Sequence, residues 1–94
     1  MSMISLYNKL VMVKAQKILQ KVLSGSKNIA FADFVVLVEA YGFHLSRVRG
    51  SHHIFVHPGV RELVNLQDVK GQVKPYQVKQ FMSLVERYNL DFEE

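Results

Sequence analysis

The side chains best suited to chemistry in this 94-residue chain are concentrated between residues 47 and 58. This stretch holds two arginines, three of the four histidines and a Gly-Ser pair. The residues concerned are Arg47, Arg49, Gly50, Ser51, His52, His53 and His57. Arginine binds phosphate through paired hydrogen bonds, and histidine gains or loses a proton near neutral pH. The stretch therefore indicates a site for an anionic ligand and proton transfer.

Strand geometry argues against a metal site built from these histidines. His52 and His53 are adjacent, so in a strand they point to opposite faces. His53 and His57 share a face but lie four residues apart, about 13 Å at roughly 3.3 Å per residue, whereas zinc binds nitrogen at about 2.0 to 2.1 Å. The chain has no cysteine, which removes disulfides, thiolate ligands and a thiol nucleophile. We expect neither a metal nor another cofactor.

General acid–base chemistry needs only one histidine and no metal. RNA suits such a site because its own 2′-hydroxyl is the nucleophile, and the protein then supplies a proton acceptor or donor and cations. Arg47 and Arg49 share a strand face about 6.6 Å apart, and Gly50-Ser51 offers backbone N–H groups and a hydroxyl beside His52. No acid accompanies Ser51 and His52, so a serine triad is not indicated. A solvated hairpin with incidental histidines is the alternative.

The composition is that of an ordinary globular protein, with 49% hydrophobic and 21% charged residues, and the length fits one domain. No apolar run approaches the roughly 18 residues of a membrane span, so we expect no membrane association and a cytoplasmic location. The net charge of +4 is an N-terminal property, because residues 1–32 carry five lysines and no acid. A polyanionic partner is compatible with this charge.

Hydrophobic periodicity predicts a first helix over about residues 8–24, ending at Gly25, with Lys14, Lys17 and Lys21 as a basic stripe on its solvent side. A second helix is predicted from residue 31 or 33 to 41, with Gly42 as its left-handed cap. This helix is apolar on both sides. We therefore expect it to be covered both by the sheet and by the first helix.

The residues after Gly42 favour β structure. Strands are predicted over residues 43–49, 52–57 and 61–66, joined by turns at Gly50-Ser51 and Pro58-Gly59. Pro75 suits the first turn of a final helix that runs to about residue 88, and the acidic residues 91–94 are expected to fray. The predicted fold is α+β, an α-β-β-β-α unit with a three-stranded antiparallel sheet and an additional N-terminal helix.

This arrangement places two helices on one face of the sheet and leaves the other face open. The histidine hairpin contributes to that open face. We divide the chain into an N-terminal amphipathic helix and linker, residues 1–28, and the α-β-β-β-α unit, residues 29–94, within one compact domain. Met12 is an alternative start codon to Met1, which would make residues 1–11 an upstream extension.

Several of these features occur together in a known family. Gly42-Phe43, a following arginine, the run Gly50-Ser51-His52-His53-Ile54-Phe55, His57-Pro58 and a final helix preceded by Lys74 resemble the HicA-type toxins, small RNA-cleaving partners of HicB antitoxins. The similarity covers about residues 31–92. It implies a double-stranded-RNA-binding-domain-like fold, metal-independent cleavage of mRNA that blocks translation, and neutralisation by a HicB-like antitoxin protein that covers the site.

The resemblance also selects site residues. It implies that His52 is the catalytic histidine of the Gly-Ser-His element. We assign Arg47, Arg49 and Lys74 as RNA phosphate contacts and Ser51 as an orienting hydroxyl. Gly50, His53 and His57 are interpreted as accessory or structural, and a milder effect of changing His53 is expected if it faces the core.

The chain departs from the family pattern in two places. Many members end the third strand in a Val-Pro-x-His element, whereas this chain has Val64-Asn65-Leu66-Gln67-Asp68, so any role of that later histidine is absent. The N-terminal helix is the second departure. Three roles are open for it: it extends the RNA surface through its lysine stripe, it helps to engage an antitoxin, or it covers the second helix, and we favour the last. Two alternatives to a toxin ribonuclease are a non-catalytic RNA-binding module of the same fold and an inactive family member that serves as a protein-interaction domain.

Overall fold

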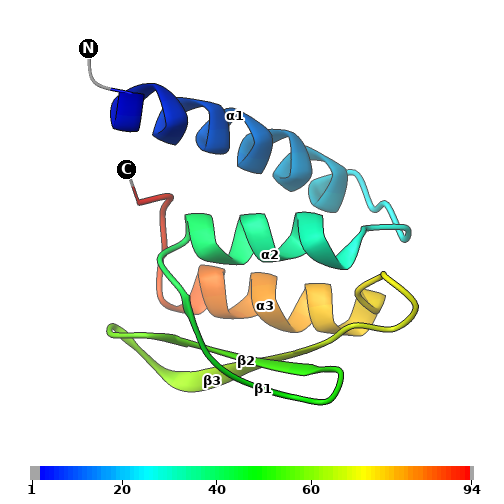
Figure 1. Cartoon of the computed structure of the whole chain (residues 1–94). Helices are drawn as coiled ribbons and strands as arrows, with labels where there is room; N and C mark the ends of the chain where they lie inside the picture. The colour runs from blue at the N-terminus through cyan, green and yellow to red at the C-terminus, as the bar shows by residue number, and fades with distance from the viewer. Residues whose placement is uncertain (1–2, 94) are drawn as a thin grey trace.

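A computed structural model describes residues 3–93, with side chains from Leu6 to Glu93. Its elements follow the chain in the predicted order (Figure 1). They are α1 (Met3–Leu23), α2 (Phe31–Ala40), β1 (His44–Arg49), β2 (His52–His57), β3 (Val60–Gln67) and α3 (Pro75–Arg87). The first helix begins at Met3, earlier than the predicted residue 8, and the other boundaries agree within one or two residues.

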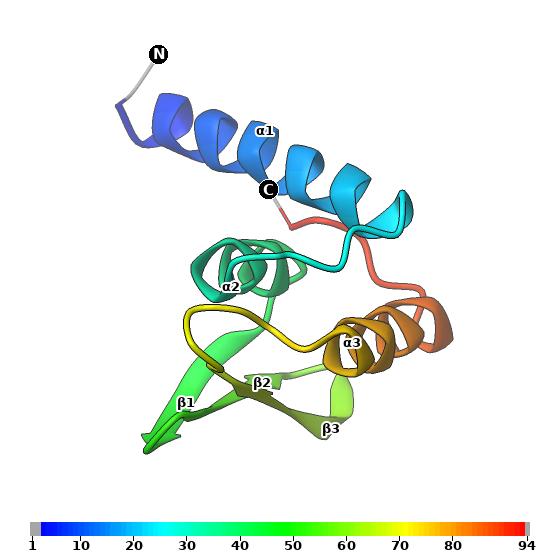
Figure 2. The ribbon, with the colours of Figure 1, turned by 90° about the vertical axis from the view of Figure 1, so that its right-hand side faces the viewer.

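The elements form three layers (Figures 1 and 2). The sheet is antiparallel with strand order β1-β2-β3, so β2 is the central strand. Helices α2 and α3 lie side by side on one face of the sheet, and α1 lies over α2 as an outer layer. The predicted α+β fold, double-stranded-RNA-binding-domain-like with an additional N-terminal helix, is confirmed, and one sheet face carries none of the helices found in residues 3–93.

Aromatic side chains from α2, α3 and the start of β1 fill the core between the helices and the sheet. The ring of Phe81 on α3 is 1% exposed and lies at its centre. Its centroid is 5.6 Å from that of Phe34, 5.8 Å from Tyr41 and 5.4 Å from Phe43. Edge-to-face and tilted pairs of this kind add to the hydrophobic contribution of the buried rings. Phe81 therefore holds α2, α3 and the entry to the sheet together.

Helix α1 packs on the side of α2 that faces away from the sheet. Ala15 is fully buried and Ile18 is 4% exposed, which shows that this contact is dry and close. An ion pair between Lys14 Nζ and Asp33 Oδ1, 3.6 Å apart, also joins the two helices, although its exposure makes it a weak contribution. The prediction that α2 is covered from two sides is confirmed.

The C-terminal segment after α3 is packed rather than frayed, so the prediction for residues 91–93 was wrong; Glu94 lies outside the described residues. The ring of Phe92 lies 4.7 Å from that of Tyr41, and the Glu93 N–H donates to the carbonyl of Ala40 at 2.8 Å. Burial raises the pKa of the Tyr41 phenol, and the negative charge of Asp91 adds to this shift. Charge density alone indicated fraying, but the aromatic contact anchors the segment.

Substitution of Ala15 tests how closely α1 packs on α2. Ala15→Leu inserts a larger side chain at a fully buried position, and we expect the free energy of unfolding to fall by about 1 to 3 kcal/mol. Gln16→Leu adds the same side chain one position along, where the helix is exposed, and serves as the control. Both leucines suit a helix. Equal urea midpoints for the two variants would show that α1 is not docked as described.

Candidate active site

His52 lies on the face of the sheet that carries no helix. On the central strand β2, Phe55 is 1% exposed and pairs with buried Val64, while His53 pairs with buried Leu66. Residues 53 and 55 therefore face the core. Because side chains alternate along a strand, His52 faces the open side. Its side chain is exposed, at the end of β2 next to the hairpin turn.

Two arginines stand beside His52 on the edge strand β1. Arg49 is directly opposite His52 in the antiparallel register, and Arg47 is opposite Ile54. Directly opposite residues lie on the same face, with Cβ atoms about 4.5 to 5.5 Å apart. Both arginines are exposed, and neither forms an ion pair within the described part of the chain. Their guanidinium groups are thus available to an anionic ligand on the open face.

A β-bulge between Leu45 and Arg47 accounts for the placement of the arginines relative to His52. The pairing shifts register there, so that Leu45 pairs with Phe55 and Arg47 with Ile54. A bulge re-aims the side chains that follow it. Gly50 closes the hairpin with φ +56°, a left-handed conformation that suits glycine, and brings Arg49 and His52 opposite each other.

Polar groups of β3 contact the Ser51-His52 pair from the other side. The Nδ1 atom of His52 donates to Asn65 Oδ1 at 3.1 Å. The Nε2 atom of Gln67 donates to Ser51 Oγ at 3.3 Å, and the N–H of Asp68 donates to the Ser51 carbonyl at 2.9 Å. The predicted orienting hydroxyl of Ser51 is therefore itself held by β3. Asn65 and Gln67 were not predicted as site residues, because only the strand register brings them there.

His53 lies on the opposite side of β2 from His52. Its ring is half-buried against Phe31 at the start of α2, with ring centroids 4.7 Å apart. Its Nδ1 donates to the Ser51 carbonyl at 3.2 Å. His53 thus stabilises the hairpin turn from the core side of the sheet. The sheet separates its ring from that of His52, which lies on the open side.

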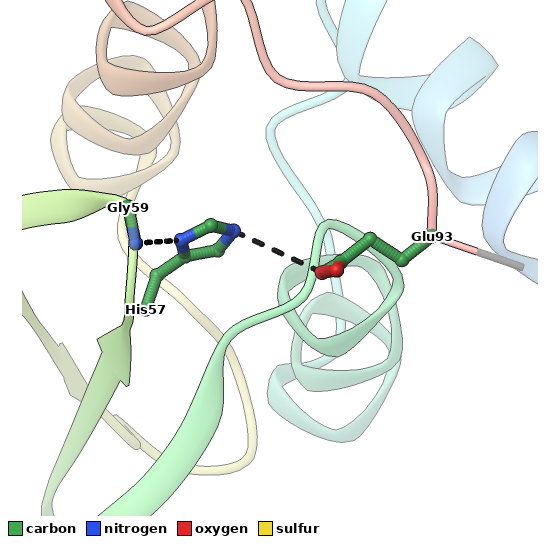
Figure 3. A network of polar contacts seen from close by, with 3 residues as sticks. All are labelled: His57, Gly59 and Glu93. Carbon is green, nitrogen blue, oxygen red and sulfur yellow. Dashed lines mark hydrogen bonds and ion pairs between the residues drawn. The ribbon is translucent and has the colours of Figure 1, made fainter.

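His57 is at the far end of β2 and belongs to a separate network (Figure 3). Its Nδ1 accepts a hydrogen bond from the Gly59 N–H at 2.9 Å, so the proton of the neutral ring is on Nε2, which lies 3.8 Å from Glu93 Oε2. The ring also packs on Phe43, with centroids 5.0 Å apart. These contacts link the β2–β3 turn to the C-terminal segment, so the role of His57 is structural.

Lys74 immediately precedes α3 and is exposed. The loop before it is tied to α2: the Phe31 N–H donates to the Gly71 carbonyl and the Val73 N–H to that of Ile29. Figure 1 shows this loop at the same end of the molecule as the β1–β2 turn. The structure does not join Lys74 to the hairpin by a hydrogen bond or ion pair among the described residues, so its predicted RNA contact depends on the ligand.

No cluster of three or more histidine, aspartate or glutamate side chains able to hold a metal ion occurs among residues 6–93. No described helix is both long and apolar enough to cross a bilayer. The candidate site is an exposed surface on a sheet, built from one histidine, two guanidinium groups and neutral hydrogen-bonding side chains.

The fold and the hairpin define a small α+β protein of the double-stranded-RNA-binding-domain-like class. Comparison with family models identifies residues 31–85, more than half of the chain, as a domain described as the HicA toxin of bacterial toxin–antitoxin systems. The protein belongs to the HicA toxin family. Searches of curated proteins and of solved structures found no match. Helix α1 lies outside the matched region, as predicted.

Removal of the His57 ring tests its structural role. His57→Ala loses the contact with Phe43 and the hydrogen bond from Gly59, and we expect it to lower the free energy of unfolding by about 1 to 2 kcal/mol. His44→Ala, at an exposed position of β1, is the matched control and is expected to change stability by less than about 0.5 kcal/mol. Urea denaturation followed by circular dichroism measures both. Similar losses for the two variants would contradict this assignment.

Proposed function

We propose that this protein is the toxin component of a type II toxin–antitoxin system and acts as a metal-independent endoribonuclease that cleaves mRNA and blocks translation. Membership of the HicA family supports the toxin role. The observation that carries the ribonuclease proposal is the position of His52, exposed on the open sheet face and directly opposite Arg49. The other two histidines of β2 are engaged in packing.

The proposed reaction is transesterification within the RNA strand. The Nε2 atom of His52 accepts the proton of a ribose 2′-hydroxyl, whose oxygen attacks the adjacent phosphorus. The bond from phosphorus to the 5′-oxygen breaks, giving a 2′,3′-cyclic phosphate and a 5′-hydroxyl. The departing 5′-oxygen receives its proton from the imidazolium of His52 or from water. Arg49 and Arg47 offset the negative charge that develops on the phosphate oxygens.

The RNA is proposed to lie across the open face, with Arg47, Arg49 and Lys74 contacting phosphates and Ser51 orienting the strand beside His52. Guanidinium groups without ion-pair partners are suited to this, since no existing salt bridge has to break. The α-β-β-β-α unit carries these groups, and helix α1 stabilises it by covering α2. The substrate places the protein in the cytoplasm.

A HicB-like antitoxin is proposed to bind over the open face and so to block access to His52. Family membership supports an antitoxin partner. The same exposed arginines that contact RNA phosphates are available to carboxylates of such a partner, because both ligands present paired oxygen atoms. Competition between RNA and antitoxin then follows from a shared surface.

Replacement of His52 tests the catalytic assignment. Wild-type expression is expected to arrest growth, and His52→Ala to relieve the arrest, because loss of a general acid–base group lowers rates by about 10²- to 10⁴-fold. His44→Ala removes an exposed histidine from the same sheet and is expected to remain toxic. Growth curves after induction, with protein levels checked by immunoblot, make the measurement.

Equal arrest by wild type and His52→Ala, or no arrest by either, would remove the catalytic role of His52. A cleavage assay then separates the alternatives. Purified protein that binds a single-stranded RNA with strong salt dependence but leaves it intact would be a non-catalytic RNA-binding module. Tight binding to a protein partner without affinity for RNA would indicate a protein-interaction domain.

The arginine contacts are testable through salt dependence. Each phosphate contact contributes about 0.7 to the slope of log K against log salt concentration for single-stranded nucleic acid. Arg47→Gln and Arg49→Gln are each expected to weaken RNA binding and to reduce that slope by about this amount. Lys27→Gln removes the same charge from the α1–α2 linker, away from the sheet, and serves as the control. Equal slopes for all variants would contradict the assignment. Fluorescence anisotropy provides the affinities.

A further inference from the structure

Three amide side chains form a connected set behind His52. Asn65 and Gln67 on β3 contact His52 and Ser51 on the open face, as described above. Gln77 on α3 contacts the backbone of the same two β3 residues: its Nε2 donates to the Asn65 carbonyl at 3.0 Å, and its Oε1 accepts from the Gln67 N–H at 3.1 Å. We call Asn65, Gln67 and Gln77 the amide network.

The position of Gln77 is unusual for its residue type. It is 6% exposed and, apart from Tyr41 with its phenol, it is the one buried residue with a polar side chain among those described. β3 is an edge strand, so its outward N–H and C=O groups have no neighbouring strand. One buried amide satisfies two of these groups at once. It fixes the β3 backbone at the two residues whose side chains reach the site.

The contact with Asn65 determines which nitrogen of His52 carries the proton. Asn65 presents its amide oxygen to Nδ1 of His52, and because this oxygen only accepts, the contact is a hydrogen bond when Nδ1 carries the proton. In the neutral ring this leaves the lone pair on Nε2. A histidine partner that fixes the tautomer in this way prepares the opposite nitrogen to accept a proton.

We propose that the amide network is a positioning device for His52, with Asn65 setting the Nδ1–H tautomer and Gln77 holding β3 in the register that presents Asn65. The catalytic part of this inference rests on the proposed ribonuclease function, whereas the tautomer does not. Asn65 and Gln67 lie in the segment, residues 64–68, where the chain departs from the Val-Pro-x-His pattern.

The tautomer is measured directly by ¹⁵N NMR of the His52 imidazole in full-length protein, at a pH where the ring is neutral. The wild type is expected to show the Nδ1–H form. Asn65→Leu removes the acceptor at an exposed position and is expected to shift His52 toward the Nε2–H form. Gln77→Met is expected to give a mixture, and Gln80→Met, at an exposed position of the same helix, to match the wild type.

Kinetics supply the second readout. For single-turnover cleavage of a labelled single-stranded RNA, Asn65→Leu is expected to lower the rate constant by about 10- to 100-fold, the range for loss of a partner that orients histidine. The RNA dissociation constant should change less than threefold. Asn65→Asp places a carboxylate at Nδ1, which favours the imidazolium, so the pH of half-maximal rate should rise by about one unit.

The other groups that face His52 limit the size of the shift expected in the pH of half-maximal rate. Arg49 lies opposite on β1, with Arg47 beside it, and β3 contributes only the neutral amides. Asp68 follows β3, but its Oδ1 already accepts from the Gly71 N–H at 2.7 Å. The substitution at Asn65 therefore adds the first carboxylate in contact with the His52 ring within the described chain.

A wild-type Nε2–H tautomer, or an unchanged tautomer in Asn65→Leu, overturns the proposal. These NMR results do not require RNA cleavage. If the wild type shows the expected tautomer, and the variant the expected shift, while neither cleaves RNA, the positioning role stands and the ribonuclease function fails. If Asn65→Leu shifts the tautomer without slowing an active enzyme, the catalytic part of the proposal is wrong.

Discussion

The alternation of side chains along β2 is the constraint on which the other features depend. As the central strand, β2 is paired on both sides and has to serve two faces at once. Phe55 points into the core, and its burial fixes the register. A slip of one residue would bring His53 to the open face and His52 against Phe31, since each step reverses the side-chain direction. Core packing thus determines which histidine is presented.

The three histidines of β2 show how one residue type serves different purposes within six positions. His53 packs on α2 and holds the hairpin turn through the Ser51 carbonyl. His57 joins the second turn to the C-terminal segment through Gly59 and Glu93. His52 contacts Asn65 through Nδ1, and its side chain is exposed. Packing contacts occupy two rings and leave the third available for a ligand.

Most of the fold was predictable from sequence because its signals are local. Glycine and proline turns, strand-forming residues and helical periodicity gave the elements in order, and Gly50-Ser51 and Pro58-Gly59 marked both turns. Periodicity left the faces of β2 undetermined, because Ile54 and Phe55 are both apolar. The structure resolves this: Phe55 belongs to the main core, whereas Ile54 is buried outside it, between Arg47 and Asn65.

Features that depend on contacts between distant residues escaped prediction. The C-terminal acids suggested a frayed end, but the Phe92 ring reaches Tyr41 across roughly half of the chain. The amide network needed the β2–β3 register and the position of α3, neither of which an isolated glutamine reveals. The sequence nevertheless contained one indication of a special role for Gln77. This residue falls on the apolar side of α3, next to the core residues Val78 and Phe81. A polar residue in such a place is usually hydrogen-bonded.

The arginines of β1 also affect the exposed edge of the sheet. β1 is an edge strand whose six residues are all exposed, including Leu45 and Val48. Such an edge invites pairing with another chain, and charged side chains along it oppose this. Arg47 and Arg49 are suited to oppose such pairing, and they lie beside His52.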